Sequence, residues 1–140
     1  MVDLEVASIG VARDFLESLR AAGVPWVASY HDFDRTPELE VLREKLAAAR
    51  DAGAAVFKAA AMIRTAADLA RLADFQQENH GIAVATMGMG PLAVVSRLLC
   101  AQHGSVLNYG FLGGVPTAPG QWSAGELRDA IRRLEPLAIR

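Results

Sequence analysis

Short apolar runs alternate with longer stretches of helical spacing along the whole chain, and this alternation restricts the possible folds more than any other feature. Each run is almost continuously apolar, which is typical of strands that are covered on both faces. A strand–helix–strand order predicts a parallel sheet with right-handed crossover connections. We expect strands at 2–6, 25–30, 54–60, 82–87 and 105–110.

The spacing of these units indicates a particular kind of parallel sheet. A repeat of about 25 residues per strand–helix unit is typical of a (β/α) barrel, which closes with eight units. This chain contains about five strand–helix units. The expected fold class is therefore α/β, a partial TIM barrel of about five units with a parallel sheet. Because no linker or low-complexity segment interrupts it, the truncated barrel is predicted to be a single domain over residues 1–140.

Residue types that begin helices stand before several of the stretches between the runs. Thr36 precedes Pro37, and proline is favoured at the first position of a helix. Thr65 and Ser123 are each followed three residues later by an acidic residue, which is the pattern of a capping box. With glycines as stop signals, these features predict helices at 11–23, 36–53, 65–81, 90–104 and 123–134.

Charge and cysteine content argue against several classes of partner and location. The formal net charge of -2 provides no basic surface, so we expect neither nucleic acid nor a membrane as partner. The single cysteine, Cys100, cannot form an internal disulfide and suits a reducing compartment. The longest uncharged stretch, 81–96, is broken by glycines and is shorter than the roughly 20 apolar residues of a membrane span. Without a secretory signal at its start, the chain is predicted to be soluble and cytoplasmic.

Residues suited to catalysis belong to different strand–helix units, and the first run contributes the carboxylates Asp3 and Glu5. Lys58 stands alone in the apolar run 54–62, His31 follows the second run, and Arg97 lies in the helix after the fourth. Because the carboxyl ends of parallel strands share one edge, we expect these side chains to converge. Simpler interpretations stay open: Lys58 can extend its ammonium to solvent, His31 can belong to a turn, and Arg97 can form a surface ion pair.

A lysine in apolar surroundings suits Schiff-base chemistry. Only the neutral amine attacks a carbonyl, and burial lowers the pKa of a lysine, as does a nearby cation such as Arg97. The resulting iminium withdraws electrons, so a neutral histidine can remove a proton from the adjacent carbon. An arginine suits bidentate binding of a substrate carboxylate. Lys58, His31 and Arg97 together predict proton abstraction next to a carbonyl.

Other chemistries have no matching motif in the sequence. The three histidines and the one cysteine lack the spacing of metal ligands, so no metal site is predicted. A serine-centred nucleophile motif, a phosphate-binding loop and the dinucleotide fingerprint are also absent from the sequence. The methionines Met87 and Met89, taken alone, are typical core residues.

Several stretches together resemble the type I 3-dehydroquinate dehydratases of the shikimate pathway, which leads to aromatic amino acids. The resemblance covers nearly the whole chain, in the family's order and spacing, and rests on VDLEV, ASYHDFDRTP, VFKAAAM, TMGMGPLAVVSRLLCAQHGSVLNYG and TAPGQWSAGELR. It implies a lyase that dehydrates the small molecule 3-dehydroquinate to 3-dehydroshikimate without a cofactor. By this resemblance, Lys58 would form the Schiff base, and His31 would act as general base and later as general acid.

The resemblance also implies which residues hold the substrate. Arg97 would bind the carboxylate of the substrate. Gln121, and Thr117 where the family usually has serine, would hydrogen-bond substrate oxygens. Met87 and Met89 would form a wall of the pocket.

The first strands of the family have no counterpart in this sequence. They supply an acidic residue and arginines for the substrate hydroxyls, and a glutamate that orients the histidine. Glu5 corresponds to a later family strand, and we assign it to substrate binding. Because an arc of five strands leaves two open sheet edges, we expect a homodimer or a completing chain to cover the opening.

Two alternatives to an active dehydratase stay open. The chain could be a catalytically weak or inactive relative that serves as a ligand-binding or assembly module. It could also be a class I aldolase-type lyase, which would share Lys58 but would not need the Ala-Pro-Gly-Gln sequence at 118–121.

Overall fold

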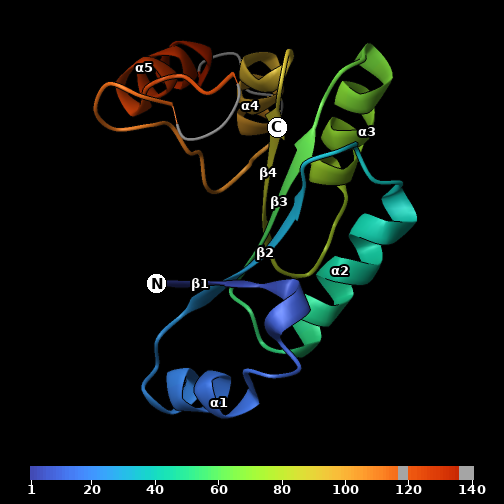
Figure 1. Ribbon diagram of the computed structural model, residues 1–140, viewed down its shortest axis with the longest axis vertical. Helices are drawn as coiled ribbons and strands as arrows, with labels where there is room; N and C mark the ends of the chain where they lie inside the picture. Colours follow the sequence, from blue (N-terminus) through green and yellow to red (C-terminus); the bar gives the residue numbers. More distant parts are fainter. Residues whose placement is uncertain (117–119, 136–140) are drawn as a thin grey trace.

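The protein forms a parallel sheet with helices packed on one face (Figure 1). The computed structural model describes residues 1–116 and 120–135. No helix in these ranges combines the length and the apolar character that crossing a membrane requires. The strands lie side by side in chain order, as β1 (Val2–Glu5), β2 (Trp26–Asp32), β3 (Val56–Met62) and β4 (Ala83–Met89). The helices are α1 (Arg13–Ala21), α2 (Leu39–Asp51), α3 (Ala66–Gln77), α4 (Ala93–Gln102) and α5 (Ala124–Leu134), with a 3₁₀ turn, η1 (Val6–Ser8), after β1.

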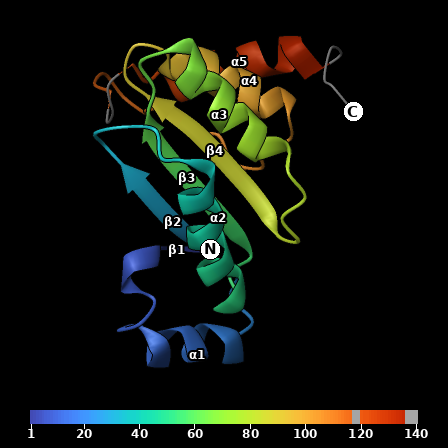
Figure 2. The same ribbon diagram turned by 90° about the vertical axis from the view of Figure 1, so that its right-hand side faces the viewer.

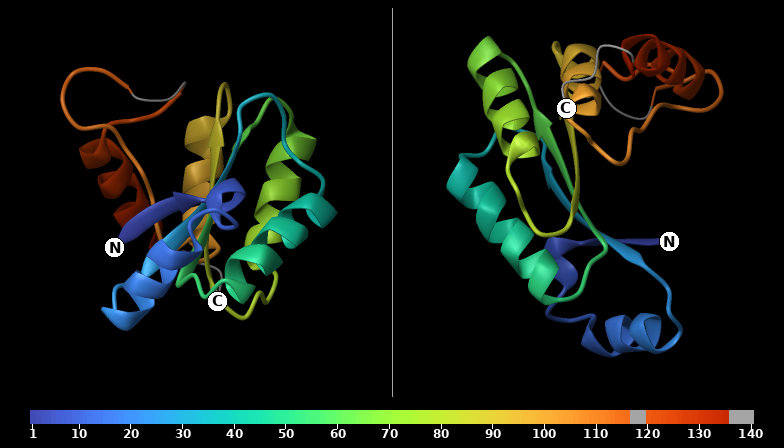
Figure 3. Two further views of the ribbon diagram at one scale, coloured as in Figure 1. Left: turned by 60° about the horizontal axis from the view of Figure 1, so that its bottom comes forward. Right: turned by 180° about the vertical axis from the view of Figure 1, so that it is seen from behind.

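The helices are distributed unequally over the two faces of the sheet. Helices α2 and α3 lie together on one face, in front of the strands in Figure 2. Helix α4 packs against β4 and α3, and α5 packs against α4. The segment 103–116 after α4 and helix α5 lie on the other side of the sheet from α2 and α3 (Figure 3). We call the face under α2 and α3 the outer face, and the opposite one the inner face.

The alternation of side chains along the strands separates an apolar outer face from a more polar inner face. On the outer face, Ala28, Phe57 and Val84 belong to the main hydrophobic core with residues of α2 and α3. The strands pair in parallel, with Ser29 opposite Lys58. By alternation and register, the inner face carries the side chains of Asp3, Glu5, Val27, Ser29, His31, Val56, Lys58, Ala60, Ala85, Met87 and Met89.

The expected fifth strand at 105–110 does not form, although this segment follows β4. The main-chain N–H of Val106 donates to the carbonyl of Val84 at 3.1 Å. The N–H of Thr86, however, donates to the side-chain hydroxyl of Ser105 at 3.3 Å. This hydroxyl takes the place of a main-chain carbonyl. The hydrogen-bond ladder between β4 and the segment 105–110 therefore ends after the single main-chain bond of Val106. Within the described residues the partial barrel therefore has four strands rather than about five.

Two of the three predicted helix caps are confirmed. Thr65 and Ser123 each form a capping box at the start of α3 and α5. Thr36 is not a cap, because its hydroxyl donates to the carbonyl of Met62 at 2.6 Å and α2 begins three residues after it. Thr36 instead ties the segment before α2 to the carboxyl end of β3.

Helix α4 approaches β4 closely because Gly88 has no side chain. The N–H of Gly88 donates to the Ser96 hydroxyl at 2.9 Å, and this hydroxyl donates to the carbonyl of Ala93 at 2.7 Å. A Cβ atom on Gly88 would collide with the Ser96 side chain. This contact fixes the position of the next residue on α4, Arg97.

Candidate active site

Lys58 lies within β3, with its side chain on the inner face of the sheet. The residue is 8% exposed. Its Nζ atom donates a hydrogen bond to Oδ2 of Asp3 at 2.8 Å. The ring of Tyr109 lies beside the same ammonium, with its centroid 5.0 Å from Nζ, which is a cation–π contact. The ammonium therefore does not extend into bulk solvent, but its surroundings are not purely apolar.

The carboxylate that contacts Lys58 is Asp3, one of the two carboxylates of the first strand. In the sheet register Asp3 pairs with Val27 on β2, and its side chain reaches across this strand to β3. Burial raises the pKa of the Asp3 carboxyl, but hydrogen bonds from Lys58 and Ser29 and the charge of Lys58 outweigh it, so the pKa lies below its ordinary value. Lys58 therefore has a carboxylate as its partner and not only the apolar surroundings that its sequence neighbours predict.

His31 lies on β2 and is also held by a carboxylate of β1. Its Nδ1 atom is 2.5 Å from Oε1 of Glu5, and its ring stacks on Phe33 with an interplanar angle of 9°. A carboxylate on Nδ1 fixes the tautomer in which Nε2 is the basic nitrogen. Glu5, predicted to bind substrate, contacts the histidine in this structure, and its role toward the substrate stays a prediction. This contact is of the kind that the resemblance assigns to a glutamate that orients the histidine.

Lys58 and His31 are diagonal neighbours on the inner face. Ser29 pairs with Lys58, and His31, two residues further along β2, pairs with Ala60. The side chains of residues two apart on a strand point to the same face. The topology therefore brings the two predicted catalytic residues together on neighbouring strands.

Arg97 is buried on α4 without a carboxylate partner. It is 2% exposed, and its Nη1 atom donates to the carbonyl of Tyr109 at 2.6 Å and lies 3.7 Å from the sulfur of Met87. Among the residues that the structure describes, its Nε atom has no hydrogen-bond partner. Within residues 1–116 and 120–135 no carboxylate forms an ion pair with Arg97. Burial lowers the pKa of its guanidinium, which nearby Cys100 only partly opposes. The interpretation as a surface ion pair is therefore wrong.

Tyr109 connects the lysine side of the site with the arginine side, and sequence reasoning did not find it. Its ring contacts the ammonium of Lys58, and its main-chain carbonyl accepts hydrogen bonds from Arg97 and, at 3.4 Å, from Nε2 of Gln121. Gln121 is 9% exposed. No sequence signal identifies Tyr109 for this role. It accepts the two hydrogen bonds through its main-chain carbonyl, a group that every residue has.

The remaining predicted residues divide into two groups. Met87 and Met89 are buried in the hydrophobic cluster of the inner face, which also contains Val27 and is contacted by Leu107. They therefore form an apolar wall on the same face as Lys58. Thr117 lies outside the described residues.

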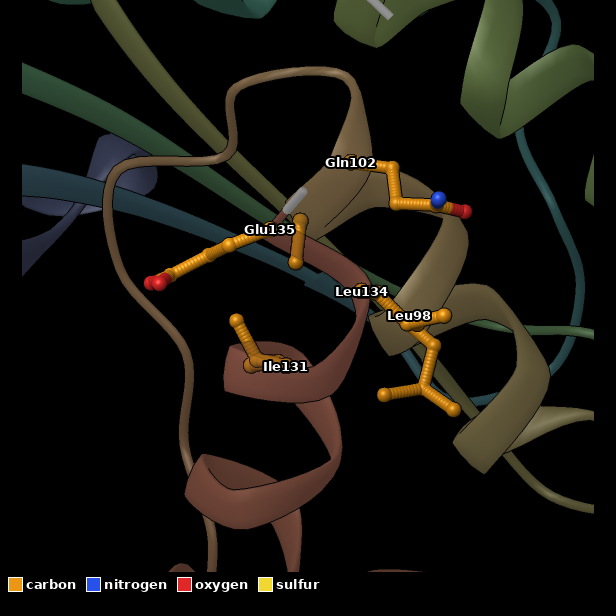
Figure 4. Close-up of a pocket in the computed structure, with 6 residues that line it drawn as sticks. Leu98, Gln102, Ile131, Leu134 and Glu135 are labelled. Atoms are coloured by element: carbon orange, nitrogen blue, oxygen red, sulfur yellow. The ribbon is translucent and has the colours of Figure 1, made fainter. Parts of the chain in front are cut away.

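A separate hollow lies between α4 and α5, away from these residues (Figure 4). Leu98, Ile131 and Leu134 make its lining mainly apolar, and Gln102 and Glu135 lie at its edge. None of the predicted catalytic residues lines it. Its lining offers one titratable group, Glu135, and no nucleophile, so this hollow is a packing feature between two helices and not the candidate site.

Metal ligands do not cluster in the described part of the chain. No group of three or more histidine, cysteine, aspartate or glutamate side chains lies close enough to hold an ion there. The chemistry that the site offers is carried by an amine, an imidazole, two carboxylates and a guanidinium.

The whole chain is similar to one protein family. The model of the type I 3-dehydroquinase family matches residues 1–137. The 3-dehydroquinate dehydratase of Methanosarcina barkeri is 33% identical over an alignment of 138 residues that covers 96% of this chain and 57% of that protein. The enzyme of the same name from Shouchella clausii is 34% identical over 135 residues, covering 94% of this chain and 52% of that protein. The chain thus spans about half the length of these relatives.

Solved structures give the same result for the fold. The 3-dehydroquinate dehydratase of Geobacillus kaustophilus superimposes with a TM-score of 0.88 and 28% identity, over 99% of this chain and 55% of that chain. The type I enzyme of Clostridium difficile, crystallised with covalently modified comenic acid, gives a TM-score of 0.87 over 97% of this chain and 56% of that chain. These structures are barrels of the TIM type, so the four-stranded sheet is part of one. The chain belongs to the type I 3-dehydroquinase family.

Proposed function

We propose that the chain is a 3-dehydroquinate dehydratase that converts 3-dehydroquinate to 3-dehydroshikimate through a Schiff base at Lys58, in the pathway to aromatic amino acids. The observation that carries this proposal is the pairing on the inner face. There the amine of Lys58 and the imidazole of His31 lie on adjacent strands, and each is held by a carboxylate of β1. An amine and a base on one face can act on neighbouring carbons of one substrate.

The reaction follows from the chemistry of these two groups. The neutral Nζ of Lys58 attacks the ketone carbon, and the ketone oxygen leaves as water, which gives the iminium. Nε2 of His31 takes a proton from the carbon next to the iminium carbon, and the electrons of the C–H bond form an enamine. The enamine expels the hydroxyl of the following carbon, which leaves as water with the proton returned by His31. Attack of water on the conjugated iminium then releases 3-dehydroshikimate and free Lys58.

The other side of the site supports binding of an acid. The guanidinium of Arg97 is buried, keeps a free Nε–H, and has no carboxylate partner in the described part of the chain. A desolvated cation in this state gains most from an incoming anion. We assign the substrate carboxylate to Arg97, substrate oxygens to Gln121 and Thr117, and the apolar wall to Met87 and Met89. No cofactor is part of the proposal.

Turnover by the isolated chain tests this function. The purified protein is incubated with 3-dehydroquinate, and the conjugated product is followed by its ultraviolet absorbance. We expect turnover that disappears in Lys58→Arg, which keeps the positive charge beside Asp3 but cannot form the imine. Turnover that persists in this variant would contradict the proposal.

A binding module without turnover is the second candidate, because the inner face is partly open. The side chains of Asp3, Glu5 and His31 are 42%, 49% and 27% exposed. Such access to water disfavours chemistry that needs a dry site. If the isolated chain binds 3-dehydroquinate in a titration but does not turn it over, this candidate replaces the first.

A second copy of the chain that covers the inner face would exclude this water. We propose a homodimer, supported by the edge position of β1, which in the described residues pairs with β2 alone and so exposes main-chain groups. Light scattering after size-exclusion chromatography tests this state, and a stable monomer at micromolar concentration would contradict it. A second, completing chain is the other way to cover this face. Location in the cytoplasm stays a prediction from composition.

A further inference from the structure

The ion pair between Lys58 and Asp3 poses a problem for imine formation. An amine attacks a carbonyl only after it has lost its third proton. In the free protein, however, Nζ forms an ion pair with a carboxylate oxygen at 2.8 Å and donates a hydrogen bond to it. Before the first step can occur, this proton needs an acceptor. In the described part of the chain, Asp3 is the one hydrogen-bond partner of Nζ.

The structure fixes the carboxylate of Asp3 in a position suited to that transfer. The Ser29 hydroxyl donates to Oδ1, so that the second oxygen, Oδ2, is left facing Nζ. Ser29 is fully buried and lies directly beside Lys58 in the sheet register. The three side chains thus form a chain of hydrogen bonds across three adjacent strands, from the Ser29 hydroxyl through the Asp3 carboxylate to the Lys58 ammonium.

We propose that Asp3 is the proton acceptor and then the proton donor for imine formation at Lys58, an inference that rests on the proposed function. Oδ2 takes one proton from the ammonium, and the neutral Nζ attacks the carbonyl carbon. One amine proton passes to the former carbonyl oxygen, which gives the neutral carbinolamine. Asp3 returns its proton to the hydroxyl, the C–O bond breaks, and water leaves. The positive iminium then faces the same carboxylate, so charge and protons balance.

The chain contains an internal reference for this role. It has two lysines, Lys45 and Lys58. Lys45 also pairs with a carboxylate, that of Glu44 at 3.1 Å, but both side chains are much more exposed, 33% and 73%. Lys45 therefore reports how an ordinary surface lysine reacts with a carbonyl compound under the same conditions.

The test measures the rate of imine formation at each lysine. Protein is mixed with 3-dehydroquinate or, separately, with glycolaldehyde, a small carbonyl compound that needs no substrate pocket. Borohydride stops the reaction after timed intervals, and peptide mass mapping quantifies the reduced adduct at Lys58 and Lys45. The variants are Asp3→Asn, Ser29→Ala and, as a matched control on the exposed side of α1, Asp14→Asn. Circular dichroism shows whether each variant is folded.

We expect Asp3→Asn to slow trapping at Lys58 by roughly 10²-fold near neutral pH, the lower range for a lost general acid–base group. Trapping at Lys45 should not change, and Asp14→Asn should behave as the unaltered protein. Added acetate should partly restore the rate at Lys58 in Asp3→Asn, because it can accept the proton. Ser29→Ala, which frees Oδ1 without touching Lys58, should slow trapping by a few-fold to about tenfold.

Equal or faster trapping at Lys58 in Asp3→Asn would overturn the inference, because Asp3 would then only stabilise the ammonium. A slow but folded Asp3→Asn variant that acetate does not rescue would also overturn it in favour of a structural role. If Asp3→Asn does not fold, an unchanged rate in Ser29→Ala overturns it. Failure of the proposed function looks different: unaltered protein would trap glycolaldehyde at Lys58 but would not trap 3-dehydroquinate.

Discussion

The two buried cations of the site, Lys58 and Arg97, are held in opposite ways. Lys58 donates to a carboxylate on β1, and the neighbouring His31 has a carboxylate on its ring as well. Arg97 donates to a main-chain carbonyl and leaves its Nε–H unpaired. The charge of Lys58 is therefore compensated in the free protein, whereas in the described residues that of Arg97 is not.

This difference separates reacting groups from a binding group. A group that must gain and lose protons benefits from a partner that exchanges them. A group that must attract an anion benefits from being desolvated and without a counter-charge. The β1 side of the inner face suits the first task, and α4 suits the second.

The largest expected effect is the loss of Lys58. Lys58→Met should reduce turnover to the uncatalysed rate, because no other group in the site can form the imine. It should also leave Asp3 without its cation, so the pKa of Asp3 should rise toward its ordinary value. Steady-state kinetics measures the first effect, and titration of the Asp3 carboxyl by NMR measures the second. Residual turnover well above background would break the assignment of Lys58 as the reacting group.

Loss of His31 should be the next largest effect. His31→Gln should slow dehydration by roughly 10²–10⁴-fold, the range for a lost general base. It should leave formation of the Lys58 adduct nearly unchanged, because the imidazole is needed after that step. Rapid-quench trapping beside steady-state turnover separates the two steps. Equal losses in both would show that His31 does not act at the later step alone.

Arg97 should affect binding more than the chemical step. Arg97→Leu removes a charge-assisted interaction of about 1.5–3 kcal/mol, so KM should rise roughly 10- to 100-fold with a much smaller change in kcat. Arg97→Lys is the matched control that keeps the charge but loses the planar donor pair, and it should give an intermediate KM. An unchanged KM in the leucine variant would contradict the assignment of Arg97 as a binding group that differs in role from the reacting Lys58.

Glu5 should have a smaller effect, through His31. Glu5→Gln removes the carboxylate that selects the tautomer with a basic Nε2, and kcat should fall about tenfold, less than on loss of the base itself. Glu17→Gln, at an exposed position of α1, is the control. A changed KM with an unchanged kcat would support the assignment of Glu5 to substrate binding.

The smallest expected effect is on stability in acid. The pKa of Asp3 is lowered although burial alone would raise it, and the Arg43 hydrogen bond lowers the pKa of Glu78. A carboxyl group whose pKa is lowered by folding stabilises the folded protein fully at pH values above its ordinary pKa, which is 3.8 for Asp3 and 4.5 for Glu78. This stabilisation is lost as the pH falls through the pKa that the group has in the folded protein. Thermal unfolding should therefore show a loss of stability below about pH 4 that is smaller in Asp3→Asn.

Much of the fold was predictable, because strand and helix patterns are local. Capping boxes such as that of Thr65 need only neighbouring residues and were found correctly. Thr36 has the same local pattern, but its hydroxyl binds a carbonyl at the end of β3, which no local rule reveals. The fifth strand failed for a similar reason, since the Ser105 side chain takes the place of a ladder bond.

The sequence indicates which residues form the candidate site better than it indicates which side chains they contact. Lys58, His31 and Arg97 are unusual in their sequence surroundings, which is what selects them, and their roles stay predictions. Their partners depend on sheet register and on loop position. Asp3 reaches Lys58 across β2, and Tyr109 reaches it from a loop about 50 residues further along the chain. The carboxylates Asp3 and Glu5 are expected at this edge, but the sequence does not indicate which side chain each of them contacts.

The central claim is that Lys58 forms an imine with 3-dehydroquinate, and the intact mass of the protein after borohydride reduction tests it most directly. We predict a single adduct of the reduced substrate imine, mapped to Lys58 and absent from Lys45, which lies outside the site. The adduct should disappear in Lys58→Arg. No adduct, or one distributed equally over both lysines, would contradict the account.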